Sequence, residues 1–441
     1  MLKFTQSSED INSNGGFSFI GRLLDSNKAM ELWDRLLPAR HNSLYTTSTV
    51  VKCAVGLMAA GEPDYADIEK FRHDSLFQML AGGAAPSQET FRQRLDALGE
   101  KDWGPLVDAC VASQLARAKP TPLRFDGMSL VPLDIDVSVF EDAAPRKEGV
   151  AMSYHGVTGY APILCYAGRE GYLVAAELRP GAQHSENGAV AFLERAVKIM
   201  EAAGCKASEL LVRADSGHDA ADFVRKLEEL GVKYLVKRNL RREDPVQILD
   251  SVRSYERPSR PRPGKTVYRG VRSDRAPAGM DGYKGFMVVE AVERTTLAGD
   301  PQRLLIPEVE AACWWTNLPS SARRCVRLYH DHGTSEQFHS ELKGDMGLEL
   351  LPSGSLKTNA LVLGLAAVAF NCLRFIGQSA LEREPAPADE KKRLARHRLR
   401  TVILDYVKVG CKVASHAGRT ILKFGRNCFN FSIMKEIYAI C

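Results

Sequence analysis

The chain has 441 residues, of which 45% are hydrophobic and 26% are charged, so it can bury sizeable cores and global disorder is excluded. Its length exceeds one ordinary core and predicts two or three domains. The net charge of +5 at pH 7 comes from 59 basic and 54 acidic residues, and by itself it does not establish a polyanionic partner.

Ten cysteines stand singly, without the paired spacing of a metal or redox motif. They predict reduced, mostly buried thiols in a cytoplasmic protein. Residues 1–16 are polar and acidic and lack the order of a secretory signal. The longest uncharged apolar run, residues 360–370, is shorter than the roughly 20 residues that span a bilayer, so we expect a core helix and no membrane partner.

Residues 1–125 have the hydrophobic periodicity of a helical region. A turn rich in glycine and alanine precedes Ser87, which is suited to cap a helix that carries Arg92 and Arg94. Such a turn followed by a basic helix resembles a helix-turn-helix recognition element, which makes this a candidate DNA-binding region with both arginines as DNA contacts. An ordinary solvated helix fits the same pattern.

From Ser129 the hydrophobic period changes from helical to alternating. The predicted strands and helices run in this order: strands 130–139, 159–166 and 172–178, helix 186–203, strand 210–214, helix 220–230 and strand 233–236. Three meandering strands followed by alternating helices and strands are typical of a ribonuclease-H-like core. The fold class is therefore α/β (mixed α+β), with a mixed sheet flanked by helices.

Residues 241–319 have β-rich runs and exceed the length of a simple loop, so they predict a β-rich insertion into the core. The core, residues 126–240, resumes over residues 320–380 with a helical pattern from Ser321 to Gln378. Residues 382–390 look like an acidic, proline-rich linker within a basic helical C-terminal region, 381–441. Between Lys391 and Arg426 there are eleven basic residues and one acid, which indicates either a phosphate-facing surface or a solvated helix face.

Acidic residues stand at two places in the predicted strands. Alternation puts Asp134 and Asp136 on one face of the first strand, where the alternative is a solvated edge. Asp215 ends an apolar strand two residues before Gly217, the position where parallel strands hold ligand-binding side chains. A plain turn-initiating aspartate is the alternative there.

A third acid lies in the segment from Tyr329 to Lys343. Helical spacing places His332, Glu336 and Lys343 on one stripe, with Phe338 and Leu342 roughly opposite, in the core. A solvated Glu and Lys pair would give the same spacing.

The spacing of this segment resembles the Tyr-Arg-Glu-Lys signature of DDE insertion-sequence transposases, on Tyr329, His332, Glu336 and Lys343. The family's first aspartate matches Asp136, followed by Val137 and Ser138, and its second matches Asp215. Residues 178–188, Leu351 to Ser353 and Asn359 are similar to the subgroup called insertion-sequence family thirteen-eighty, within the broader insertion-sequence four group. The resemblance covers residues 40–430, and His332 stands where the family has Arg.

The resemblance implies that Asp136, Asp215 and Glu336 are catalytic and hold Mg²⁺, which Mn²⁺ can replace, for DNA cleavage and strand transfer. Asp134 would support these three carboxylates without binding the metal itself. The implied DNA contacts are Tyr329, His332, Lys343, Lys237 and Arg238, and near the end of the insertion Trp314 and Trp315 are either buried strand aromatics or a base-stacking site. A zinc site at His330, His332 and His339 is the rival metal site, but no cysteine joins it.

The implied partners are double-stranded DNA, as terminal inverted repeats and as target, and a second copy in a homodimeric synaptic complex. The implied place is the bacterial cytoplasm, associated with the nucleoid. Two other functions remain open on the residues alone: a catalytically inactive, transposase-derived DNA-binding protein, and a stand-alone metal-dependent nuclease.

Overall fold

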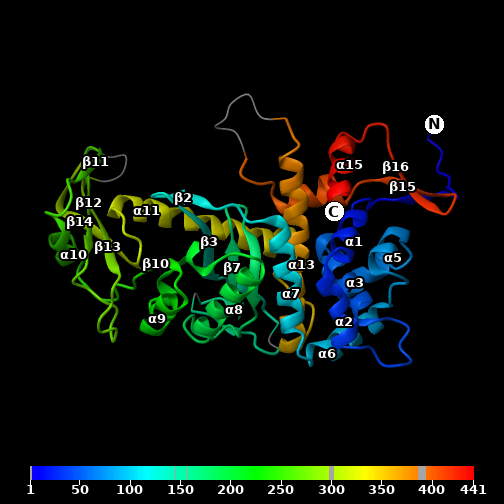
Figure 1. Cartoon of the computed structure of the whole chain (residues 1–441), viewed down its shortest axis with the longest axis horizontal. Coiled ribbons are helices and arrows are strands. Elements are labelled where there is room, and N and C mark those ends of the chain that lie inside the picture. The colour runs from blue at the N-terminus through cyan, green and yellow to red at the C-terminus, as the bar shows by residue number, and fades with distance from the viewer. Residues whose placement is uncertain (1, 145, 155, 297–301, 386–393) are drawn as a thin grey trace.

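The computed structural model describes residues 2–144, 146–154, 156–296, 302–385 and 394–441. Figure 1 shows an elongated arrangement in which the N-terminal helices lie at one end, the central sheet in the middle and the β-rich insertion at the other end. Helix α13 (Leu356–Leu381) runs between the N-terminal helices and the sheet. It is long and apolar enough to cross a membrane, but 89% of its most apolar window is buried within the protein, as expected of a core helix.

The N-terminal region is helical, as the periodicity predicts. Its helices are α1 (Phe17–Asp25), α2 (Glu31–Leu36), α3 (Thr47–Ala59), α4 (Ile68–Phe71), α5 (Ser75–Ala81), α6 (Gln88–Gly99) and α7 (Gly104–Ala118). Ser87 caps α6 by accepting a hydrogen bond from the Thr90 backbone N–H, which confirms the predicted start of this helix. Gly82, with φ +76°, ends α5 in the left-handed conformation that glycine adopts without strain.

The centre of the molecule is a mixed sheet, as predicted. Strands β3 (Met128–Val137), β7 (Ile163–Ala167) and β8 (Tyr172–Glu177) are antiparallel neighbours. On the other side of β3, β9 (Leu210–Ala214) is parallel to β3 and β10 (Lys233–Lys237) is parallel to β9. Helices α8 (Ala189–Ala202) and α9 (Ala221–Leu230) connect these strands at the predicted places.

The insertion continues this sheet instead of forming a separate one. It consists of α10 (Pro245–Val252), β11 (Ser259–Arg262), β12 (Lys265–Arg272), β13 (Phe286–Thr296) and β14 (Arg303–Thr316). The end of β14 pairs with β10, with Leu235 opposite Thr316, so the strand order is β11-β12-β13-β14-β10-β9-β3-β7-β8, and β2 (Leu123–Phe125) also pairs with β3. A small separate sheet contains β4 (Phe140–Glu141), β5 (Ala151–Met152) and β6 (Thr158–Tyr160).

Strand alternation divides the sheet into two apolar faces. Val131, Leu133 and Ile135 of β3 belong to the larger core. Leu130 belongs to a second core under α11 (Ala322–His330). Asp134 and Asp136 have the parity of Leu130, so both point to the α11 side, which confirms that they share one face.

The helical pattern expected from Ser321 to Gln378 is interrupted. Helix α11 gives way to a 3-10 turn over Asp331–Thr334, then α12 (Ser335–Ser340), a π turn over Glu341–Asp345 and a loop before α13. The expectation of one regular helical stripe through this segment is therefore wrong, because a 3-10 turn and a π turn change the rotation per residue.

The C-terminal region is only partly helical, which corrects the expectation of a helical basic region. It contains α14 (Leu399–Val402), the hairpin β15 (Cys411–His416) and β16 (Arg419–Phe424), and α15 (Phe431–Ile440). The hairpin turns at Ala417 and Gly418, both at positive φ, and β15 also pairs with β1 (Asp10–Asn12). Part of the expected linker, residues 386–390, and the basic residues Lys391 to Arg393 lie outside the described residues. All ten cysteines are free, as expected.

Candidate active site

Two of the predicted acids lie side by side at the carboxyl ends of parallel strands. Ile135 of β3 pairs in parallel with Ala214 of β9. Asp136 directly follows Ile135, and Asp215 directly follows Ala214. Neighbouring strands are about 4.8 Å apart, so the two carboxylates leave the sheet from adjacent positions. Their side chains are 21% and 42% exposed, which leaves both accessible to a ligand at this edge.

Each of these carboxylates is held by a histidine. His339 Nε2 donates to Asp136 Oδ2 at 3.2 Å, and His218 Nδ1 donates to Asp215 Oδ1 at 2.8 Å. The Gly217 backbone N–H also donates to Asp215 Oδ1 at 3.1 Å. Burial alone would raise the pKa of Asp215, but the hydrogen bonds from His218 and Gly217 lower it below its ordinary value. Asp215 is thus held in its ionised form.

Neither histidine was predicted to hold a carboxylate. His339 appeared in the sequence only as a member of the rival zinc cluster, although it follows Glu336 by one helical turn. In the structure it is buried, and its Nδ1 lies 3.5 Å from the Tyr166 hydroxyl. His218 is fully buried against Phe223, and its Nε2 has no hydrogen-bond partner among the described residues.

Glu336 is exposed in the first turn of α12 and forms no hydrogen bond or ion pair with the residues that the structure describes. His332 and His339, four residues before and three after it, contact Asp134 and Asp136 of β3. The helix that carries Glu336 is thereby fastened to the strand that carries the first aspartate. In the described part of the chain, however, no three His, Cys, Asp or Glu side chains are grouped closely enough to hold a metal ion.

Asp134 differs from Asp136 by being buried, with 2% exposure. Arg213 donates to both of its oxygens, from Nε at 2.6 Å and from Nη2 at 2.8 Å, and His332 Nδ1 donates to Oδ1 at 2.9 Å. Arg213 also donates to the Leu328 carbonyl at 2.8 Å, so the cluster joins β3, β9 and α11. Burial opposes ionisation, but Arg213 and His332 lower the pKa of Asp134 below its ordinary value.

His332 therefore points into the protein, not along an exposed stripe with Glu336 and Lys343. Its side chain is 8% exposed, because the 3-10 turn rotates it toward Asp134. Burial alone would lower the pKa of His332, but the Asp134 carboxylate raises it above 6.5. Phe338 and Leu342 are buried, as predicted.

The remaining signature residues surround this edge. Tyr329 is half-buried between the rings of Trp314 and His332, and its pKa is raised by burial and by the nearby carboxylates. Lys343 Nζ donates to the Val139 carbonyl at 3.0 Å, which ties the π turn to the end of β3.

Two predicted basic contacts lie at the end of β10. Lys237 follows Val236, the partner of Ala214, so it is next to Asp215 across the parallel strands. Arg238 is ion-paired with Glu243 and lies 5.5 Å from the Trp315 ring centre. Trp314 and Trp315 are both buried, which favours the interpretation of strand aromatics in this structure.

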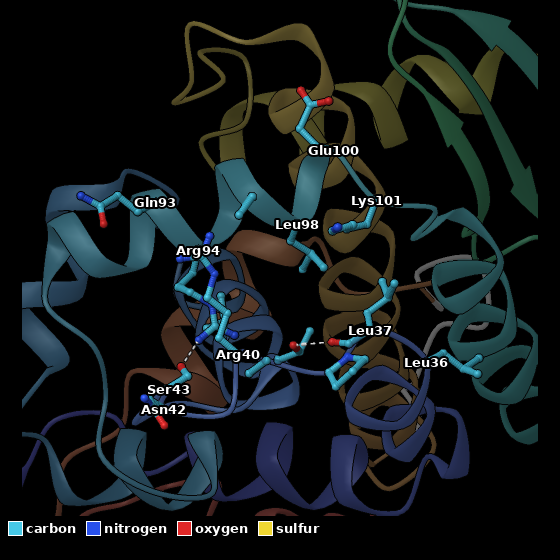
Figure 2. Close-up of a pocket in the computed structure, with 15 residues that line it drawn as sticks. Leu36, Leu37, Arg40, Asn42, Ser43, Gln93, Arg94, Leu98, Glu100 and Lys101 are labelled. Carbon is cyan, nitrogen blue, oxygen red and sulfur yellow. Dashed lines mark hydrogen bonds between the residues drawn. The ribbon is translucent and has the colours of Figure 1, made fainter.

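The predicted basic helix α6 has its arginines engaged within the protein. Arg92 is ion-paired with Glu89 at 2.7 Å and Asp96 at 2.8 Å. Arg94 lies at a pocket of about 830 Å³, where it donates to the Ser43 hydroxyl and, at 2.8 Å, to the Tyr45 carbonyl. Figure 2 shows Arg94 directed toward Ser43, with Arg40 beside it.

Two of the resembling sequence blocks have structural roles in the fold. A side chain at Gly217 would meet Ser185 Oγ at 3.1 Å, so the 178–188 loop packs directly against the Asp215 turn. The Asn359 side chain exchanges hydrogen bonds with the Ser353 backbone, at 2.9 Å as acceptor and 2.8 Å as donor. This pairing closes the loop that leads into α13.

Residues 2–440 match the family described as transposase DDE domain, group 1. No match was found among curated proteins. Among solved structures the chain is similar to piggyBac transposase in a synaptic complex with hairpin DNA, at 13% identity, over 89% of this chain and 79% of that chain, with a TM-score of 0.41. Because the family match spans nearly the whole chain, the protein belongs to the DDE-domain transposases of group 1.

Proposed function

We propose that this transposase cleaves DNA at terminal inverted repeats and joins the freed ends to target DNA by cut-and-paste transposition, with Asp136, Asp215 and Glu336 as its catalytic triad. The observation that carries the proposal is the parallel register of Ile135 and Ala214, which puts two partly exposed carboxylates next to each other. Glu336 is included in the proposal because its helix is tied to Asp136 through His339.

The strand order β10-β9-β3-β7-β8, with β9 and β10 parallel to β3, supports a ribonuclease-H-like core. We assign residues 126–240 and 320–380 to this catalytic domain, 241–319 to the insertion, 1–125 to an N-terminal DNA-binding region and 381–441 to a basic C-terminal region. Partners of the same proposal are a second copy of the chain and double-stranded DNA in the bacterial nucleoid.

The residues of the edge fit a hard divalent cation in their donor chemistry. Asp215 Oδ2 has no hydrogen bond within the described residues, and neither oxygen of Glu336 has one. Carboxylate oxygens are the ligands that Mg²⁺ and Mn²⁺ prefer. When bound, such ions stabilise the negative charge that builds on the attacking and leaving oxygens of phosphoryl transfer. Closing the triad requires Glu336 to approach the two aspartates.

The other side chains of the edge position this triad or contact DNA. His339 and His218 fix the orientation of Asp136 and Asp215 by occupying one oxygen of each. We assign phosphate contacts to Lys237 and Lys343, and a contact with the DNA strand to Tyr329. His332, which replaces the usual Arg, holds Asp134 and so positions α12 instead of binding phosphate.

Arg238, Arg92 and Arg94 are further proposed DNA contacts, and each of them, like Lys343, already has a protein partner. Each would have to exchange that partner for a phosphate. Their contribution to binding should therefore be smaller than that of Lys237, which forms no ion pair with the described residues.

The experiment uses purified full-length protein and labelled duplexes tiled across the DNA on both sides of its reading frame. Cleavage at a discrete position in Mg²⁺, absent in EDTA, followed by joining to a target plasmid, is expected. Cleavage without joining would identify a stand-alone nuclease. Sequence-specific binding without cleavage in either Mg²⁺ or Mn²⁺ would contradict the proposal and identify a DNA-binding protein with an inactive triad.

A further inference from the structure

A basic groove lies between α11 and the outer strands of the insertion. It has a volume of about 640 Å³ and is floored by the apolar side chains of Val267, Val292 and Val326. Six basic residues line it: Arg260, Lys265, Arg269, Arg323, Arg327 and His330. We call it the α11–insertion groove. None of these residues belongs to the transposase signature or to the DNA contacts assigned above.

The basic residues form two facing walls. Arg323, Arg327 and His330 are exposed and lie at positions i, i+4 and i+7 of α11, which is one stripe of a helix. The other wall comes from the insertion, with Arg260 on β11 and Lys265 on β12. Because the two walls come from different parts of the chain, only the folded protein assembles this charge.

Most of this charge has no partner among the residues that the structure describes. Of the two acids that line the groove, Glu290 is ion-paired with Arg269 at 2.6 Å, which leaves Asp331. Arg260, Lys265, Arg323 and Arg327 form no ion pair or side-chain hydrogen bond with the described residues. Glu310 on β14 is bound by Arg294 at 2.8 Å, and the Arg294 hydrogen bond, with a smaller contribution from Lys265, lowers the pKa of Glu310.

Facing cations above an apolar floor repel one another and attract an anion. Several cations arranged in two rows match a ligand that carries repeated negative charges, and a nucleic-acid backbone is such a ligand. The position of the groove also fits a nucleic-acid ligand. Helix α11, which forms one wall, continues through the 3-10 turn into α12, the helix that carries Glu336.

We propose that the α11–insertion groove binds the sugar–phosphate backbone of double-stranded DNA beside the cleavage position, independently of its sequence. The choice of DNA rests on the proposed function. The insertion thereby acts as one wall of a backbone clamp and α11 as the other. Contacts to phosphates position DNA without reading its bases, so the groove should hold any duplex equally well.

The test measures binding in EDTA, where cleavage does not occur, for a duplex from the flank of the reading frame and for an unrelated duplex of equal length. The variants are Arg323→Gln with Arg327→Gln on one wall, and Arg260→Gln with Lys265→Gln on the other. Arg324→Gln is the matched control, since Arg324 is exposed on the same helix but ion-paired with Asp126. Circular dichroism and melting temperature check that each variant is folded.

Each double variant should weaken the binding of both duplexes by a similar factor. The slope of log affinity against log salt should become shallower by about 1.8, because each of the two lost phosphate contacts accounts for about 0.9. Arg324→Gln should leave affinity and slope unchanged. An unchanged slope in either double variant, or a loss confined to the flanking duplex, would overturn the proposal. Cleavage assays of the wild-type protein are scored separately, so a chain that binds as expected but never cleaves would refute the proposed function and leave the groove standing.

Discussion

Charged side chains have different surroundings at the edge of the sheet where β3 and β9 end and in the α11–insertion groove. At the edge, Asp134, Asp136 and Asp215 are each held by a histidine, and Asp134 also by a buried arginine. In the groove, four cations have no partner among the described residues. Phosphoryl transfer needs reacting atoms in fixed positions, whereas binding a backbone needs only positive charge along a path. The contrast teaches that the three aspartates are fixed in place by hydrogen bonds, whereas the cations of the groove stay available to a ligand.

The largest expected effect comes from removing the charge of the triad. Asp136→Asn, Asp215→Asn and Glu336→Gln should each reduce Mg²⁺-dependent cleavage by at least about a thousandfold, because each removes an oxygen donor needed in the transition state. Binding of DNA in EDTA should stay at the wild-type level, since the groove is untouched. A variant that still cleaves would remove its residue from the triad.

Asp134 and Asp136 should differ in how much each contributes to the stability of the fold. Asp134→Asn leaves Arg213 buried with an incomplete partner, so the free energy of unfolding should fall by about 3–5 kcal/mol. Asp136→Asn is the matched control: it is two residues away and partly exposed, and should change stability little. Urea unfolding of the two variants measures the difference. Equal stability would mean that Asp134 is not the structural member of the pair.

His339 should have an intermediate effect, because it acts through Asp136 instead of touching DNA. We expect His339→Ala to slow cleavage about 10- to 100-fold and to raise the Mg²⁺ concentration required for half-maximal rate. His339→Gln keeps an N–H donor and should recover part of the loss. The control is His41→Ala, at an exposed position. An unshifted Mg²⁺ dependence in His339→Ala would rule out a positioning role.

The smallest effect concerns pH. The pKa of His332 is raised above 6.5 in the folded chain, so its ion pair with Asp134 stabilises the fold fully below the unfolded pKa. That stabilisation is lost as the pH rises through the raised folded value. The difference in melting temperature between the wild type and His332→Gln should therefore be larger at about pH 6 than at about pH 9. A constant difference would show that the pair does not depend on the charge of His332.

Local pattern was sufficient for much of the core. Alternation along residues 130–137 predicted that Asp134 and Asp136 share a face, and the end of an apolar strand predicted the position of Asp215. The strands, the connecting helices and the capping role of Ser87 were predicted for the same reason. Side-chain direction in a strand and hydrogen bonding at a helix end depend on residues close in the sequence.

Contacts between distant residues decided the rest. Which aspartate is buried depends on Arg213, which β9 brings beside β3. The carboxylate partners His218 and His339, and the joining of the insertion to the sheet through β10 and β14, had no local signal strong enough to predict them.

The availability of the basic residues was also decided by tertiary structure. Arg92 on the predicted recognition helix is neutralised by its neighbours, whereas Arg323 and Arg327 face the insertion without a partner among the described residues. The amino-acid composition does not distinguish a paired arginine from an unpaired one. Pairing and burial set the electrostatic energy of a charge, and both are properties of the folded chain.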